Sequence, residues 1–136
     1  MIIKSLTLSV RDREEIDICL KHVKSGGGVQ EATLTVAPNT YTGNGIHAYI
    51  KDGFCYVQGY LYKSTSVSLP SGFVDLITGF PKYTEQPLFV IFDYVNNKGW
   101  SGRLSPNETN AKLQISLPSA QSIGNLCVNF VYKIAS

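Results

Sequence analysis

The sequence predicts a mostly β domain: an antiparallel β-sandwich, jelly-roll-like, with a short N-terminal helix or hairpin. Two alternating, aromatic-rich runs flank Asp52-Gly53, and an Asp-Gly pair supplies the positive φ angles that a two-residue type I′ hairpin turn requires. Similar alternating runs, about eight in all, recur between Gly, Pro and Asn clusters, a spacing typical of sandwiches and barrels. Only 16% of the residues are charged, below the roughly 25% of an average domain.

Length and composition narrow the possible classes of protein. The 136 residues correspond to one domain, and a chain of this size buries roughly two-thirds of its unfolded surface. The net charge of +2 is too small to indicate nucleic acid or another polyanion as a partner. The longest apolar run, 88–92, is too short to cross a bilayer, and no signal peptide is visible. We therefore expect no nucleic-acid and no membrane partner.

The first part of the chain differs from the rest. We expect residues 1–28 to form a connecting or neck segment and residues 29–136 to form the β domain. Residues 12–24 fit two structures. Asp12 and Glu15 have the spacing of a capping box, with acids in the first turn and bases in the last, which favours a helix. Alternating apolar residues in the same stretch fit a hairpin instead.

Strands and turns alternate through the β domain. The clearest strand is 125–134, because its even-numbered residues from Leu126 to Ile134 are all apolar and define one face. Such a face needs a partner sheet, so this strand is predicted to be central. Loops are predicted at 69–72 and 79–87, where Pro and Gly interrupt the pattern. The remaining predicted strands of the domain are 33–37, 46–51, 54–63, 88–95, 100–104 and 112–117.

The sequence contains no recognisable pattern of catalytic or metal-binding residues. His22 and His47 are far apart, and neither has the Cys or His spacing of a zinc site. No serine lies in a G-x-S-x-G elbow, and nothing pairs the few carboxylates as a glycosidase requires. We therefore expect no enzyme: no catalytic residues, no metal and no cofactor.

The cysteine count points to a protein made in a reducing compartment. Cys19, Cys55 and Cys127 are the three cysteines, and no two of them form a C-x-x-C pair. An odd number without metal-ligand spacing predicts buried free thiols. The alternative is one disulfide with a single cysteine left over.

Aromatic residues provide the main indication of a binding site. Aromatic rings pack on the apolar faces of sugars, while amide, carboxylate and guanidinium groups bind the hydroxyls. Such a site follows the general pattern of an apolar floor with a few polar groups. The hairpin 93–103 carries all of these groups. Tyr60 and Tyr62 also share one strand face, but half-buried packing explains them as well as a sugar site does. The candidate saccharide-binding residues are Asp93, Tyr94, Asn96, Asn97, Trp100 and Arg103.

This candidate site carries a structural condition. Trp100 and Arg103 are three residues apart, so they lie on opposite faces of a regular strand. They line one site only if Gly102 carries a bulge, which a glycine within a strand permits. The alternative is that Trp100 belongs to the core and that Asn96 and Asn97 serve only the turn.

A family resemblance adds to this interpretation. The chain contains, in order, YIKDGFCYVQGY at 49–60, LPSGF at 69–73, GFPKY at 79–83, AKLQI at 111–115 and VNFVYKI at 128–134. In this order the motifs resemble the C-terminal head, or receptor-binding, domain of bacteriophage tail-fibre, baseplate and minor structural proteins. The likeness covers about two-thirds of the chain, and no binding residue carries over by motif.

The resemblance implies a non-enzymatic β-sandwich head, usually a homotrimer, at the tail tip of a virion. Such a head binds host cell-wall or surface polysaccharide, contacts other tail or baseplate proteins, and is made in the host cytoplasm. Two alternatives remain open. One is a purely structural virion module that binds only other tail proteins, and the other is a cellular lectin-like carbohydrate-binding module.

Overall fold

The described residues form an antiparallel β fold, as the sequence predicts. The computed structural model describes residues 28–106 and 110–135, so the predicted helix or hairpin at 12–24 and Cys19 lie outside the described residues. None of the described segments is a helix long and apolar enough to cross a membrane. The strands are β1 (Gln30–Glu31), β2 (Thr35–Val36), β3 (Gly43–Asn44), β4 (His47–Lys51), β5 (Phe54–Tyr62), β6 (Val67–Leu69), β7 (Gly72–Phe80), β8 (Leu88–Asp93), β9 (Lys98–Leu104), β10 (Ala111–Leu117), β11 (Gln121–Ile123) and β12 (Leu126–Lys133).

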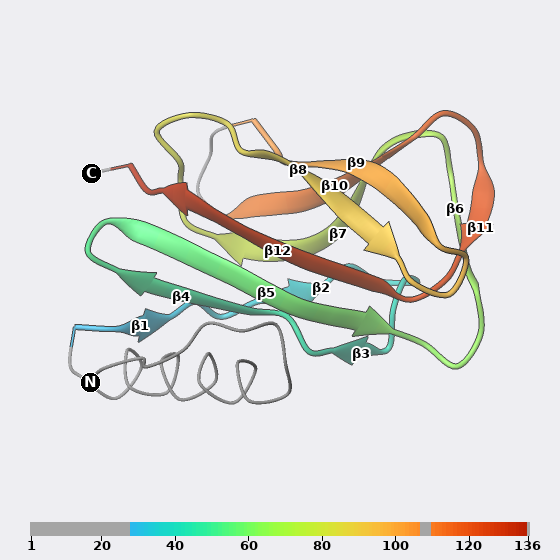
Figure 1. Ribbon diagram of the computed structural model, residues 1–136, viewed down its shortest axis with the longest axis horizontal. Coiled ribbons are helices and arrows are strands. Elements are labelled where there is room, and N and C mark those ends of the chain that lie inside the picture. The colour runs from blue at the N-terminus through green and yellow to red at the C-terminus, as the bar shows by residue number, and fades with distance from the viewer. Residues whose placement is uncertain (1–27, 107–109, 136) are drawn as a thin grey trace, which may run out of the picture.

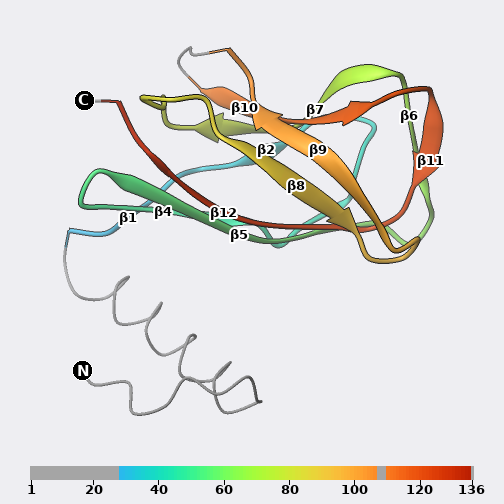
Figure 2. The ribbon, with the colours of Figure 1, turned by 45° about the horizontal axis from the view of Figure 1, so that its top comes forward.

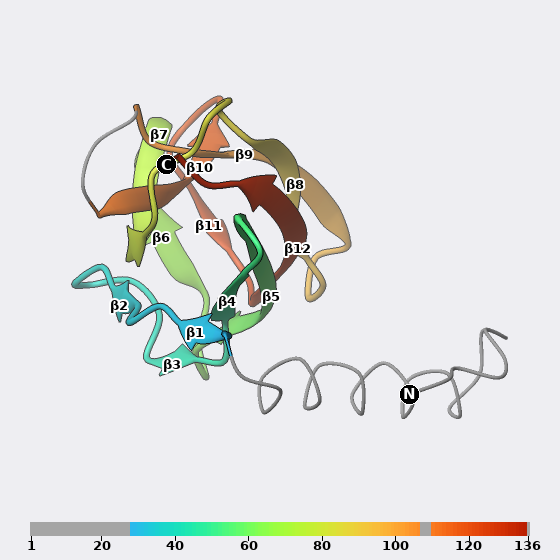
Figure 3. The same ribbon diagram turned by 90° about the vertical axis from the view of Figure 1, so that its left-hand side faces the viewer.

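Ten of these strands belong to one curled sheet. Its order is β1-β4-β5-β12-β8-β9-β10-β7-β2, with β3 paired to β5. The predicted central position of the last strand is confirmed, because β12 lies between β5 and β8 (Figure 1). The end view in Figure 3 shows how the sheet curls until its two halves face each other. The separate pair β6 and β11 lies at one end of the curled sheet (Figure 2).

One core fills the space between the two halves of the sheet. On β12, Leu126, Val128 and Tyr132 are buried and Phe130 is half-buried, and Ile134 just after the strand is also half-buried, which confirms the predicted apolar face. Burying a large aliphatic side chain contributes about 1.5–3 kcal/mol, so this layer is the main source of stability. Fully buried side chains come from both halves: Val57, Leu61, Leu76, Ile77, Phe80, Ile91, Leu104, Leu113, Ile115 and Leu126.

The hairpin between β4 and β5 has the predicted turn. Asp52 and Gly53 have φ angles of 53° and 81°, both positive as a type I′ turn requires. Lys51 pairs directly with Phe54 across the turn. This turn fixes the register of β5, and the register in turn decides which of its side chains face outward.

The two halves of the sheet are joined by a short ladder. β12 pairs with β8 only where Leu126 faces Asp93 and Cys127 faces Phe92. Beyond this ladder, β8 and β12 are joined by side chains, because the rings of Phe89 and Phe130 stack with centroids 3.8 Å apart.

Strand β7 departs from the sequence prediction. No strand was predicted between the loops at 69–72 and 79–87, and the second of these loops was wrong at its start, because β7 runs through Gly79 to Phe80. Two register shifts interrupt the pairing of β7 with β10, and the neighbours Leu76 and Ile77 are both buried. Such irregularities break the alternation that identifies a strand in a sequence. The return strand β9 likewise begins at Lys98, two residues before the predicted start.

Candidate functional site

Asp93, predicted as an acceptor for sugar hydroxyls, is used inside the protein. Its side chain is only 1% exposed. One carboxylate oxygen accepts the N–H groups of Val95 (3.1 Å) and Asn96 (2.9 Å), and the other accepts the Asn96 amide (2.8 Å) and the Gly124 N–H (2.9 Å). Burial alone would raise the pKa of Asp93, but these hydrogen bonds outweigh it and leave the pKa below its ordinary value. The carboxylate therefore anchors the β8–β9 loop.

Trp100 and Arg103 do not lie on one surface. Trp100 pairs with Ile91, is half-buried and packs against the core. Gly102 keeps regular pairs with Phe89 and Ile115, so the bulge that a shared site requires is not formed. Arg103 therefore points to the outer face, away from Trp100. This arrangement agrees with the alternative interpretation, in which Trp100 belongs to the core.

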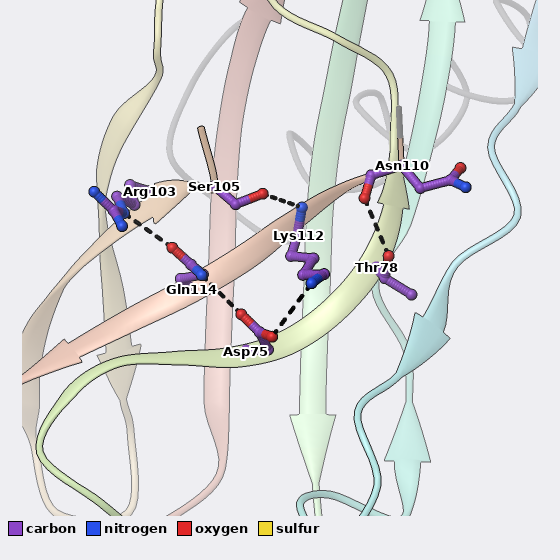
Figure 4. Close-up of polar contacts among 7 residues, drawn as sticks. All are labelled: Asp75, Thr78, Arg103, Ser105, Asn110, Lys112 and Gln114. Atoms are coloured by element: carbon purple, nitrogen blue, oxygen red, sulfur yellow. Dashed lines mark hydrogen bonds and ion pairs between the residues drawn. The ribbon is translucent and has the colours of Figure 1, made fainter. Parts of the chain in front are cut away.

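Arg103 belongs instead to a polar row on the outer face of β9, β10 and β7 (Figure 4). Its Nε donates to Oε1 of Gln114 (2.9 Å), and the Gln114 amide donates to Oδ1 of Asp75 (2.7 Å). Lys112 Nζ lies 3.7 Å from the other Asp75 oxygen, and the Arg103 guanidinium lies 3.4 Å from the ring centre of Phe73. The polar groups of this row bond to one another, so they are less available to a ligand.

The other three predicted residues lie in the loop between β8 and β9, and all are exposed. Asn97 has a φ of 56°, and the Asn96 side chain is bonded to Asp93, so both asparagines serve the turn. Tyr94 differs, because its ring meets the ring of Tyr60 edge-on with centroids 5.8 Å apart. This contact joins the predicted hairpin to a different surface.

That surface is the outward face of β4, β5 and β12. Alternate residues of β5 point outward, and their cross-strand partners on β4 and β12 share the same face. Tyr60 is 56% exposed and Tyr56 42% exposed. Exposed apolar surface that gathers in one patch is typical of interaction sites. We call it the tyrosine face: Tyr49, Tyr56, Gln58, Tyr60, Tyr62, Tyr94, Asn129 and Val131.

A groove of about 310 Å³ lies on the tyrosine face. Tyr49 and Tyr56 are cross-strand partners, and Tyr56 also faces Val131 on β12. The floor includes Val57 and Phe130, whose side chains belong to the core layer below. The full lining is Tyr49, Tyr56, Val57, Gln58, Asn129, Phe130 and Val131.

Two amide side chains complete this groove. Gln58 and Asn129 are cross-strand partners on β5 and β12. Their side-chain amides make no hydrogen bond with any other residue that the structure describes. Each amide offers two donors and one acceptor oxygen, the groups that bind hydroxyls. The groove thus combines aromatic walls with unpaired amides.

The backbone under the tyrosine face is held in place by neighbouring glycines. The N–H of Gly45 donates to the carbonyl of Tyr60 at 2.7 Å. A side-chain carbon at Gly43 would overlap the ring of Tyr62, and one at Gly59 would overlap the backbone of Gly45. These glycines let β3 and its loop approach β5 closely, so the backbone beneath the tyrosines is tightly packed.

A second hollow fits a ligand less well. It has a volume of about 430 Å³ and lies on the β6–β11 pair. It contains no aromatic side chain and no charged group, so little in it would orient a bound molecule. Its lining is Ser68, Leu69, Pro70, Ala120, Gln121 and Ser122.

Neither of the two cysteines in the described part of the chain is activated. Cys55 is buried and Cys127 is half-buried, and both are free thiols. Burial raises the pKa of Cys55 to about 11, although a hydrogen bond with Tyr132 opposes the shift. Burial also raises the pKa of Cys127, and a thiol with a raised pKa is a poor nucleophile. Residues 28–106 and 110–135 contain no cluster of three His, Cys, Asp or Glu suited to a metal ion.

Of the six predicted site residues, only Tyr94 lies on the tyrosine face. Four residues of the groove were not predicted from the sequence as site residues: Tyr49, Tyr56, Gln58 and Asn129. A signal for them exists in β5, where Tyr, Gln, Tyr and Tyr occupy alternate positions from 56 to 62, with Val57, Gly59 and Leu61 between them. No protein-family model, curated protein or solved structure matches this chain.

Proposed function

We propose that this chain is a non-enzymatic saccharide-binding domain and that its tyrosine face holds the sugar. One observation carries the proposal: the groove places the rings of Tyr49 and Tyr56 beside the unpaired amides of Gln58 and Asn129. The rings suit the apolar face of a sugar, and the amides suit its hydroxyls. The unactivated thiols and the internally bonded Asp93 support a binding role over catalysis.

The biological setting in this proposal is the tip of a bacteriophage tail. The resemblance of the chain to tail-fibre and baseplate head domains supports it, and the ligand is then host cell-wall or surface polysaccharide. A homotrimer is part of the proposal. The most exposed large hydrophobic side chains, Leu88 (77%) and Val90 (65%), lie on the outer side of β8 and suit a contact between copies.

The same two residues favour a second candidate function. A structural virion module that binds only other tail proteins also needs an exposed apolar contact, and Leu88 and Val90 supply one. Such a module has no need of unpaired amides beside exposed tyrosines. The groove therefore favours the saccharide-binding proposal over this candidate.

A glycan array tests the proposal directly. The full chain is applied to immobilised neutral and charged glycans, beside a variant with Gln58→Ala and Asn129→Ala. We expect the parent protein to bind a subset of glycans and the variant to lose most of the signal, because the hydroxyl-binding groups are gone. An array without signal for the parent protein would contradict saccharide binding and favour the structural module.

A further inference from the structure

We infer that the tyrosine face binds an extended, uncharged polysaccharide segment in two aromatic subsites, rather than a single terminal sugar. The inference rests on the proposed function and specifies the class of its ligand. It follows from the spacing of the aromatic rings, from the position of the amides between them and from the charges around the face.

The rings on the tyrosine face form two groups. The first group is the groove, where Tyr49 and Tyr56 lie side by side as cross-strand partners on β4 and β5. The second group is formed by Tyr60, its edge-on neighbour Tyr94 and Tyr62, the next outward residue on β5. Each group offers exposed aromatic surface, so each is a separate subsite for a sugar ring.

Gln58 and Asn129 lie between the two subsites. Gln58 is the outward residue of β5 between Tyr56 and Tyr60, and its cross-strand partner is Asn129. Outward neighbours on one strand are separated by about 6.7 Å, so Tyr56 and Tyr60 lie about 13 Å apart along β5. One sugar ring cannot cover both subsites and the amides between them, whereas a chain of several sugars can.

The charges around the face indicate an uncharged ligand. From 56 to 60 on β5 and from 127 to 131 on β12, no outward residue carries a charge. Lysines flank the two ends of the face. Lys51 and Lys133 pair with Phe54, one outward position beyond Tyr49 and Val131, and Lys63 follows Tyr62. On β4, His47 is the cross-strand partner of Gln58, and its Nδ1 lies 2.9 Å from a carboxylate oxygen of Glu31. Between the subsites, an acidic polysaccharide would therefore meet no lysine or arginine, and the one imidazole there is paired with a carboxylate.

The test compares oligosaccharide length with the position of the substitution. Titration calorimetry measures the affinity of the full chain for neutral oligomers of glucose, galactose, mannose and N-acetylglucosamine, from one to six units. Oligogalacturonate of six units serves as the acidic comparison. The variants are Tyr56→Ala and Tyr60→Ala, and the control is Phe73→Ala, an exposed aromatic ring (51%) on β7 outside the tyrosine face.

We expect at least one neutral six-unit oligomer to bind about tenfold or more tightly than its two-unit form, because a second ring then becomes buried. Tyr56→Ala and Tyr60→Ala should each weaken six-unit binding about tenfold. Only one of the two should affect the two-unit form, whose length covers a single subsite. Phe73→Ala should leave both affinities unchanged, and oligogalacturonate should bind more weakly than the neutral six-unit oligomer.

Contrary results separate this inference from the proposed function. Equal affinity for one and six units, or tighter binding of oligogalacturonate, would overturn the extended neutral ligand while leaving saccharide binding intact. No binding to any oligomer would overturn both. If Tyr60→Ala instead lowers the oligomeric state in light scattering and no affinity depends on length, the face contacts a second copy of the chain and the inference is wrong.

Discussion

The side chains of Trp100 and Arg103 leave β9 on opposite faces, Trp100 toward the core and Arg103 toward the polar row that begins with Gln114. The two residues therefore play separate parts. Trp100 fills the layer beneath β8, where its cross-strand partner is Ile91. Trp100, which was predicted as a binding residue, therefore supports the fold instead.

Trp100→Ala should destabilise the protein without weakening saccharide binding. Removing a large ring that packs on the core leaves a cavity, and we expect a loss of about 3 kcal/mol in the free energy of unfolding. Urea denaturation measures this loss, with Tyr94→Ala as the exposed aromatic control from the neighbouring loop. A Trp100→Ala protein that keeps its stability but no longer binds sugar would return the site to the β8–β9 hairpin.

Asp93 should make stability depend on pH. Because the pKa of Asp93 is lowered in the folded protein, its contribution is complete above the ordinary carboxyl pKa and is lost as the pH falls through the lowered value. Asp93→Asn should cost about 2 kcal/mol at neutral pH, since the buried N–H group of Gly124 and the part-buried N–H group of Asn96 lose an ionised acceptor.

The measurement for Asp93 is chemical denaturation of the parent protein and of Asp93→Asn at several pH values. The difference in unfolding free energy should shrink as the pH falls from about 5 to about 2. Asp75→Asn provides the control, because Asp75 is a half-exposed carboxylate of the polar row. A difference that stays constant over this range would show that the Asp93 charge does not stabilise the fold.

Removal of β12 should abolish folding. This strand pairs with β5 along its whole length and joins the two halves of the sheet through β8. A chain that ends at Ile123 lacks this strand and exposes the edges of both neighbours. We expect an insoluble product or one with no cooperative thermal transition. Cooperative unfolding of the shortened chain would contradict the central role of β12.

The proposed homotrimer makes a prediction for β8. Light scattering of the full chain at micromolar concentration should give three times the mass of 14.9 kDa. Leu88→Arg should shift the mass toward the monomer, because a charge at an apolar contact between copies is costly. Since Leu88 is 77% exposed in one chain, the substitution should not affect folding itself. A monomer in the parent protein would remove the trimer and weaken the tail-tip proposal.

The sequence predicts features of the fold that depend on local chemistry. The Asp52-Gly53 turn forms because only positive φ angles close this hairpin. The apolar face of β12 follows from strict alternation. β7 is different, since its bulges place Leu76 and Ile77 in the core side by side and hide the period of the strand. Pairing with β10 stabilises those bulges, and that partner lies far along the chain.

The binding site is harder to predict, for a similar reason. Alternation shows that Trp100 and Arg103 face opposite ways, but only the curl of the whole sheet decides which of these sides is the core. The same curl decides that Tyr56 and Tyr60 point outward. The pairing of Gln58 with Asn129 depends on the register of β5 with β12, which no local pattern reveals.

The most direct test of the account is the effect of one ring on sugar binding. Tyr60→Ala and Phe73→Ala each remove an aromatic ring that is more than half exposed, one on the tyrosine face and one on the opposite half of the sheet. The measurement is the affinity of both variants for the glycan that gives the strongest array signal. We expect about a tenfold loss of affinity for Tyr60→Ala and none for Phe73→Ala, with both melting temperatures close to that of the parent. Equal affinities in the parent and in Tyr60→Ala would contradict a saccharide site on the tyrosine face.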